Sequence, residues 1–177
     1  MRYLKERGIR SVFIHDMTDS ECREALRRAT VGRLACAKDN QPYVVPISFM
    51  IDGDHLYAFA TLGQKIEWMR TNPRVCLEID ERIARERWQS VVVFGTYEEL
   101  PDVPKFAAAR TKAQELLQKH AMWWQPACVC DDERDTPHSD EPIAFRINIT
   151  RMTGHRATPN LNDSQVQHEV ELKKKDQ

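Results

Sequence analysis

The chain of 177 residues carries 26 lysines and arginines against 27 aspartates and glutamates, a formal net charge of −1 with histidine neutral. That length suits one domain with a hydrophobic core and polar tails. The near-neutral charge argues against nucleic acid or an anionic membrane as the partner, because both bind proteins with an excess of basic residues. It is compatible with a small ligand.

No apolar run approaches the roughly 18 residues that a membrane-spanning helix needs. Residues 1–7 are too charged for a secretory signal, so we expect a cytoplasmic protein that makes no membrane contact. The five cysteines are an odd number, and Cys22, Cys36 and Cys76 lie in apolar stretches. This pattern favours reduced, buried thiols over a disulfide framework.

The first predicted elements are one helix and three strands. Thr18 and Glu21 form a Thr-x-x-Glu capping pattern, which predicts a helix over residues 19–29. Apolar and β-branched residues separated by polar turns then predict strands over residues 31–38, 43–51 and 55–61. Their short connections are typical of an antiparallel meander.

The second half of the chain predicts three more strands and two helices. Helical spacing from residue 66 ends at Asn72-Pro73, and a second helix is expected over residues 103–120. Alternating patterns predict strands over residues 75–80, 88–98 and 143–152. Residues 81–87 have charges of mixed sign, and residues 131–141 hold six acids, so both are interpreted as exposed loops.

Six predominantly antiparallel strands with short helices between them predict a mainly β protein, either a small barrel or a sandwich. We expect an N-terminal extension over residues 1–17, a folded domain over residues 18–155 and a polar, mobile tail over residues 156–177.

One junction between a strand and a helix has the composition of an anion site. Thr61 ends a predicted strand, Gly63 precedes a helix, and Lys65 lies in its first turn, which brings a hydroxyl, free backbone amides and an ammonium together. The missing side chain of Gly63 leaves room for a phosphate. The alternative is that Thr61 caps the helix, Gly63 makes a turn and Lys65 is a surface charge.

The order of several motifs resembles the FMN-binding split-barrel proteins related to pyridoxamine 5'-phosphate oxidase, in the branch that includes the nitroimidazole-resistance proteins. The resemblance covers roughly residues 18–154. The motifs that carry it are Gly32-Arg33-Leu34-Ala35, Pro42 to Phe49, His55-Leu56-Tyr57, Thr61-x-Gly63-x-Lys65, Asn72-Pro73-Arg74-Val75 and Trp88-x-Ser90-Val91-Val92-Val93-x-Gly95.

The resemblance implies a six-stranded antiparallel split β-barrel with flanking short helices, and a homodimer with FMN in the groove between subunits. By resemblance, one strand lines the flavin ring and ribityl chain, a strand end with its turn holds the phosphate, and the partner's fifth strand approaches the cofactor. The residues in these three roles are Pro46, Ile47, Ser48 and Phe49, then Ala60, Thr61, Gly63 and Lys65, then Trp88 and Ser90.

Two departures limit what the resemblance predicts. The nitroimidazole-resistance proteins have a functional histidine just before the phosphate turn, where this chain has Ala58, Phe59 and Ala60. The pyridoxamine phosphate oxidases carry a basic cluster for a second phosphate. Here the only candidates near the C-terminus are Arg146, Arg151, His155 and Arg156.

Two other groups of residues suggest chemistry. Trp123 and Trp124 either form a wall of a substrate pocket or pack on the barrel and the dimer seam. Cys128 and Cys130, with His120 and His138 nearby, have a spacing that does not match a structural zinc site, so no metal is expected.

The sequence thus predicts an FMN-dependent oxidoreductase acting on a small, planar substrate. Its protein groups need only hold the cofactor and control access to it, because the flavin supplies the redox chemistry. A carrier, a sensor or a haem-degrading protein on the same fold remains the alternative, and a haem or a deazaflavin remains the alternative cofactor.

Overall fold

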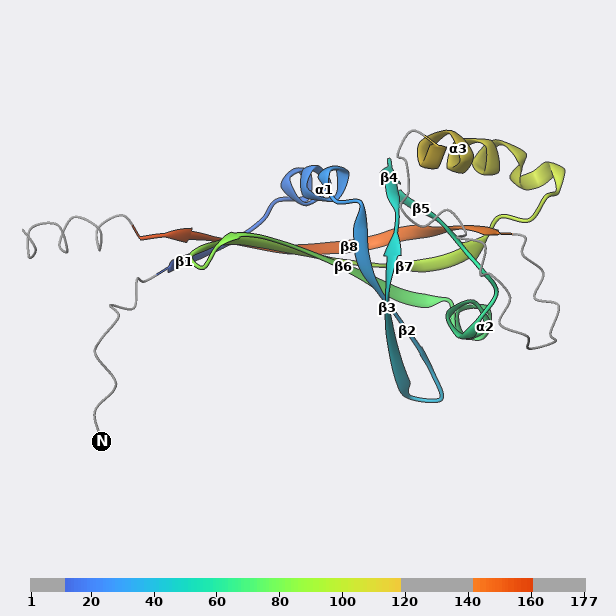
Figure 1. The fold of residues 1–177 in the computed structure, drawn as a ribbon, viewed down its shortest axis with the longest axis horizontal. Helices are drawn as coiled ribbons and strands as arrows, with labels where there is room; N and C mark the ends of the chain where they lie inside the picture. The colour runs from blue at the N-terminus through green and yellow to red at the C-terminus, as the bar shows by residue number, and fades with distance from the viewer. Residues whose placement is uncertain (1–11, 119–141, 161–177) are drawn as a thin grey trace, which may run out of the picture.

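The computed structural model describes residues 12–118 and 142–160. Within them lie eight strands and three α-helices (Figure 1). The strands are β1 (Val12–Asp16), β2 (Val31–Lys38), β3 (Gln41–Ser48), β4 (Met50–Asp52), β5 (His55–Ala60), β6 (Arg74–Ala84), β7 (Arg87–Glu99) and β8 (Ile143–Pro159). The helices are α1 (Asp19–Arg28), α2 (Gln64–Thr71) and α3 (Ala107–Gln118), the last preceded by a 3-10 turn at Pro104–Phe106.

All strand pairs are antiparallel, and the hydrogen-bonded order is β3-β2-β6-β7-β8-β5-β4, with β1 added to β8. The first and last strands of this order, β3 and β4, are consecutive in the chain. The strands therefore surround one core, to which β2, β5, β6, β7 and β8 contribute apolar side chains. This confirms the predicted class, a mainly β, antiparallel split barrel with short helices.

A buried phenylalanine explains why one predicted strand is two. Residues 43–51 were expected to run as one strand, but Phe49 interrupts the pairing between β3 and β4. Its side chain is fully buried, and its backbone amide donates to the carbonyl of Thr30 at 3.2 Å. The chain thereby leaves β2 at the end of β3, and β4 pairs with β5 instead.

The prediction of a loop over residues 81–87 is wrong. β6 continues to Ala84 and β7 begins at Arg87, so only Arg85 and Glu86 form the turn. The charged composition indicated exposure correctly, since every side chain from Glu81 to Arg85 is exposed. Exposure does not exclude a strand here, because pairing with β7 satisfies the backbone groups across the hairpin.

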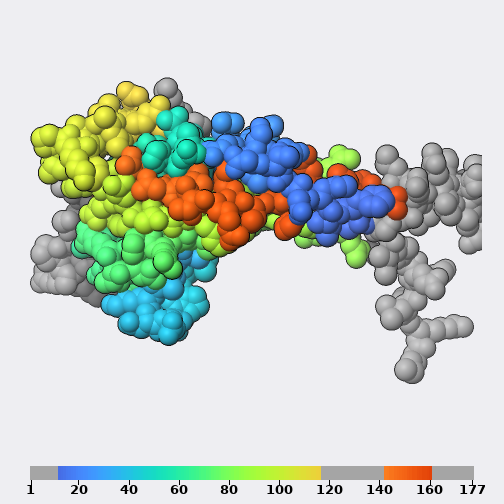
Figure 2. Space-filling view, turned by 180° about the vertical axis from the view of Figure 1, so that it is seen from behind, coloured from blue at the N-terminus to red at the C-terminus, as the bar shows by residue number. Residues whose placement is uncertain are grey.

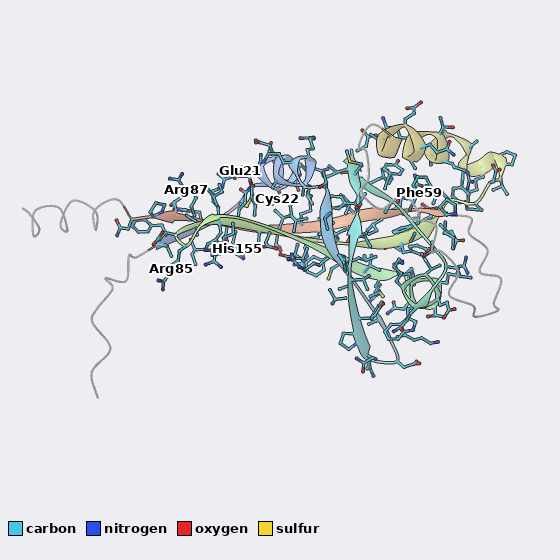
Figure 3. The ribbon with its side chains drawn as sticks, in the orientation of Figure 1. Glu21, Cys22, Phe59, Arg85, Arg87 and His155 are labelled. Carbon is cyan, nitrogen blue, oxygen red and sulfur yellow. The ribbon has the colours of Figure 1, made fainter. Side chains whose placement is uncertain are left out.

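The tip of this hairpin, together with β1 and the end of β8, forms an arm that extends away from the barrel. Figure 2 shows β1 and β8 side by side along this narrower half of the molecule. β1 comes from residues expected in the N-terminal extension, and β8 continues to Pro159. Figure 3 places Arg85 and Arg87 in this arm, far from Phe59 on β5.

Two helices cover the sheet as their patterns indicate. At the start of α1, the Thr18 hydroxyl accepts from the Glu21 amide at 3.3 Å, and the Glu21 carboxylate accepts from the Thr18 amide at 2.8 Å, which confirms the capping box. α1 buries Cys22 and Leu26 against the main core. α3 buries Ala113 in a second apolar cluster on β5 and β8.

Candidate functional site

The start of α2 lacks a side-chain cap. Gly63 is the N-cap residue, and its carbonyl accepts from the amides of Ile66 at 2.9 Å and Glu67 at 3.1 Å. Thr61 is exposed and does not cap the helix. Among the described residues, no acceptor is found for the amides of Gln64 and Lys65. Free amides at a helix N-terminus attract an anion, since the helix dipole adds to their partial positive charge.

Lys65 adds a full positive charge to this turn. Its side chain is partly buried, and burial lowers the pKa of its ammonium group from the usual value. No carboxylate of residues 12–118 or 142–160 forms an ion pair with it. A partly desolvated ammonium without a counter-charge is unfavourable, and an anionic ligand would relieve that penalty.

Neither crowding nor backbone strain explains the glycine of this turn. A Cβ atom added at Gly63 would meet no atom within 4 Å, and its φ of 166° is extended backbone that any residue adopts. The space above the turn is therefore open. Such space allows a phosphate to approach the free amides closely.

The residues expected to line a flavin on β3 fall into two groups. Ile47 and Phe49 are buried in the barrel core, where Ala60 at the end of β5 joins them. Pro46 is exposed, and the side chain of Ser48, the residue between Ile47 and Phe49, is buried. The core residues can offer a ligand outside the barrel only backbone atoms, whereas side-chain contacts there would come from Pro46 and Ser48.

Trp88 and Ser90 do not lie beside Lys65 in the same chain. Ser90 pairs with Asp80, six residues along β6 from Arg74, which is close to the end of α2. At about 3.4 Å per residue this separation is about 20 Å. Trp88 and Ser90 do share a sheet face with Pro46. Paired residues of neighbouring strands point to the same face, and the pairing that starts at Pro46 continues across β2 and β6 to β7.

That outer face of the sheet exposes apolar side chains. Val44 is 57% exposed and lies in the same row as Ala35, Cys76 and Phe94, which are partly buried. The guanidinium of Arg151 lies 4.3 Å from the centre of the Phe94 ring. On the arm, Ile14 of β1 is 59% exposed, and its partner Ala157 pairs in turn with Trp88.

Sequence reasoning missed an ion pair that joins α2 to the end of β7. Arg70 donates from Nε and Nη2 to the two Glu99 oxygens, each at 2.8 Å, and Tyr97 donates its hydroxyl to Glu99 at 3.0 Å. The hydrogen bonds from Arg70 lower the pKa of Glu99, and burial raises that of Tyr97. No local sequence pattern predicts this ion pair, because Arg70 and Glu99 lie 29 residues apart.

Other predicted candidates lie outside the described residues, namely His120, Trp123, Trp124, Cys128, Cys130 and His138. Within the described ranges, no three histidine, cysteine, aspartate or glutamate side chains lie close enough together to hold a metal ion. No described helix has both the length and the apolar character needed to cross a membrane.

Comparison with known proteins gives consistent matches. Residues 18–156 match the family model described as pyridoxamine 5'-phosphate oxidase. An uncharacterized protein of Rhizobium meliloti is 38% identical over 146 residues, which are 82% of this chain and 97% of that protein. The crystal structure of an FAD-binding protein from Mesorhizobium loti is 41% identical, with a TM-score of 0.70, over 84% of this chain and 99% of its own.

A more distant structure shares the fold. A candidate 5-nitroimidazole antibiotic resistance protein from Bacteroides thetaiotaomicron is 19% identical, with a TM-score of 0.64, over 90% of this chain and 97% of its own. The resemblance to the pyridoxamine 5'-phosphate oxidase family suggested by the sequence motifs is thus confirmed, and the more distant structure supports the fold. The matched model spans the barrel and the turn that carries Lys65, and the chain belongs to the pyridoxamine 5'-phosphate oxidase family.

Proposed function

We propose that this protein binds a flavin nucleotide, with the phosphate next to the ribityl chain held by Lys65 and the first turn of α2. The observation that carries the proposal is the ammonium of Lys65, which is partly buried and lacks a counter-charge among the described residues. The uncapped amides beside it supply hydrogen-bond donors in the same place. The name of the Mesorhizobium loti relative, an FAD-binding protein, supports a flavin as the ligand.

The expected FMN fits this arrangement as the smallest flavin with a phosphate. Pro46 and Ser48 would contact the flavin on the outer side of β3, and Thr61 would offer a hydroxyl beside the phosphate. When bound, the flavin supplies the electron transfer, so the protein needs no paired catalytic acid and base. The residues of this chain bind and orient the cofactor and limit the access of water.

A second copy of the chain is the proposed partner. Trp88 and Ser90 share the outer face with Pro46, but Ser90 lies about 20 Å along the strands from the end of α2. They would approach a flavin only if it were bound by another subunit. The exposed Val44 on the same face supports a dimer, because a face with apolar side chains is stabilised by burial against a partner.

Within such a homodimer we propose an oxidoreductase of the cytoplasm, which passes electrons between a reduced nicotinamide or another donor and a small, planar acceptor. The absorption spectrum of the protein as isolated tests flavin binding. Steady-state turnover of NADH or NADPH with a panel of acceptors then tests catalysis. Binding without turnover would make the protein a carrier or sensor, and reconstituted protein with no flavin affinity would refute the proposal.

Sedimentation velocity of the purified protein tests whether it forms a homodimer. Val44→Glu places a charge on the outer face and should convert the dimer to monomer without unfolding it, since this side chain is exposed in one chain. Lys38→Glu, at the exposed last residue of β2, is the matched control and should leave the dimer intact. A monomeric wild-type protein would contradict the assignment.

A further inference from the structure

A cavity of about 320 Å³ opens beside the turn that carries Lys65. Leu62 of that turn forms one wall, and Arg70 of α2 and Arg110 of α3 form two others. The start of β8 and the segment after β7 complete the lining. Figure 1 shows both helices at the end of the molecule opposite to β1. The cavity and the proposed phosphate site therefore share one turn of the chain.

The charges around the cavity balance. Among the described residues, the lining holds Arg70 and Arg110 together with Glu99 and Asp102, that is, two positive and two negative groups. Arg70 is held by both oxygens of Glu99, and Arg110 donates to the carbonyl of Leu100 at 3.2 Å. A lining without net charge does not concentrate a second anion. It suits a neutral ligand that has both polar and apolar parts.

The lining matches an adenosine group in chemistry. The exposed carboxylate of Asp102 can accept from ribose hydroxyls, whereas both oxygens of Glu99 already accept from Arg70. Guanidinium planes stack on aromatic rings, and the bidentate contact with Glu99 fixes the plane of Arg70 in advance. Leu62, Leu100 and Ile143 add apolar surface for a purine.

The size of the cavity limits what it can hold. A volume of about 320 Å³ is at the lower end for small-molecule pockets, so a complete flavin dinucleotide does not fit. A single nucleoside fits, if the phosphate attached to it lies outside the cavity. We propose, on the basis of the function proposed above, that this cavity holds the adenosine end of FAD, while the FMN half of the same molecule lies at Lys65. The protein then prefers FAD to FMN.

Calorimetric titration of the flavin-free protein with FAD, FMN and riboflavin tests the proposal. We expect FAD to bind at least 10-fold more tightly than FMN. Adenosine, which has no phosphate to occupy the site at Lys65, should compete with FAD and should not compete with FMN. Equal affinities for FAD and FMN would overturn the adenosine site and leave the proposed flavin function intact, whereas no affinity for any flavin would refute both.

A variant that fills the cavity provides a second test. Asp102→Trp changes an exposed side chain on the rim, so the fold should survive, which circular dichroism checks. The variant should lose the 10-fold advantage of FAD and keep the affinity for FMN. Lys38→Trp, at the exposed last residue of β2, is the matched control and should change neither affinity. An equal loss for both flavins in Asp102→Trp would contradict the proposal.

Discussion

Replacing Lys65 by methionine separates recognition of the phosphate from all other contacts with the flavin. The side chain keeps nearly its length and loses its charge. A hydrogen bond to a charged group contributes about 1.5–3 kcal/mol, which corresponds to about a 10-fold to 150-fold weaker affinity for FMN. Riboflavin has no phosphate, so its affinity should not change. Calorimetry of both ligands with both proteins measures the difference.

The free energy of unfolding of the flavin-free protein should not fall in Lys65→Met. The ammonium is partly buried and makes no ion pair with described residues, so its removal takes away a desolvation penalty and no attraction. Lys38→Met, which removes an exposed charge, is the control for the loss of one cation. An equal loss of affinity for FMN and riboflavin would refute the reasoning, because it would show damage to the pocket and not the loss of a phosphate contact.

The same residue gives a pH dependence with a definite sign. Burial lowers the pKa of Lys65 below the ordinary lysine value of 10.5. In the folded, flavin-free protein the proton is therefore lost earlier than in the unfolded chain, and stability rises with pH between the lowered pKa and 10.5. Over this window the affinity for FMN should fall as the ammonium becomes neutral. Both slopes should be absent in Lys65→Met.

Three further substitutions test the local physics. Gly63→Ala should cost less than about 1 kcal/mol of stability, as expected for an N-cap glycine, yet weaken FMN binding, which thermal melts and calorimetry compare. Gly95→Ala should cost about 1–3 kcal/mol in a denaturant titration, because its Cβ would lie 2.5 Å from Ile147, and an unchanged midpoint would contradict this. Thr18→Ala should cost about 1 kcal/mol in a denaturant titration, because it removes the hydroxyl that caps α1. The Thr18 backbone amide, which does most to lower the pKa of Glu21, remains, and only the smaller contribution of the hydroxyl is lost, so the difference from wild type should shrink in acid.

Local patterns predicted the elements whose structure depends on nearby residues. The capping box of Thr18 and Glu21 lies within four residues, and it defined the start of α1 correctly. The turn around Gly63 and Lys65 was likewise recognised from adjacent residues. In both cases the backbone amides at a helix start need partners, and the residue types nearby indicate which partners are available.

Features that depend on distant pairing could not be predicted in this way. β1 has five exposed residues, and only its pairing with the end of β8 makes it a strand. The hairpin tip around Arg85 is charged and exposed, so its composition indicated a loop. Leu62, Arg70 and Arg110 line one cavity although they come from three different parts of the chain, and their spacing in the sequence does not predict that they lie close together.

The pattern of ion pairs supports a binding role for Lys65 over a structural one. Among the described residues, the other partly buried cations all have partners. Arg23 contacts Asp19 and Asp54, Lys112 contacts Asp52, Arg146 contacts Glu98, Arg156 contacts Glu21, and Arg110 donates to a backbone carbonyl. Where this chain partly buries a positive charge to build its fold, it supplies an acceptor. Within residues 12–118 and 142–160, Lys65 lacks an acceptor and lies beside two free amides. A ligand would best supply that acceptor, and a phosphate matches both the charge of Lys65 and the hydrogen-bonding capacity of the turn.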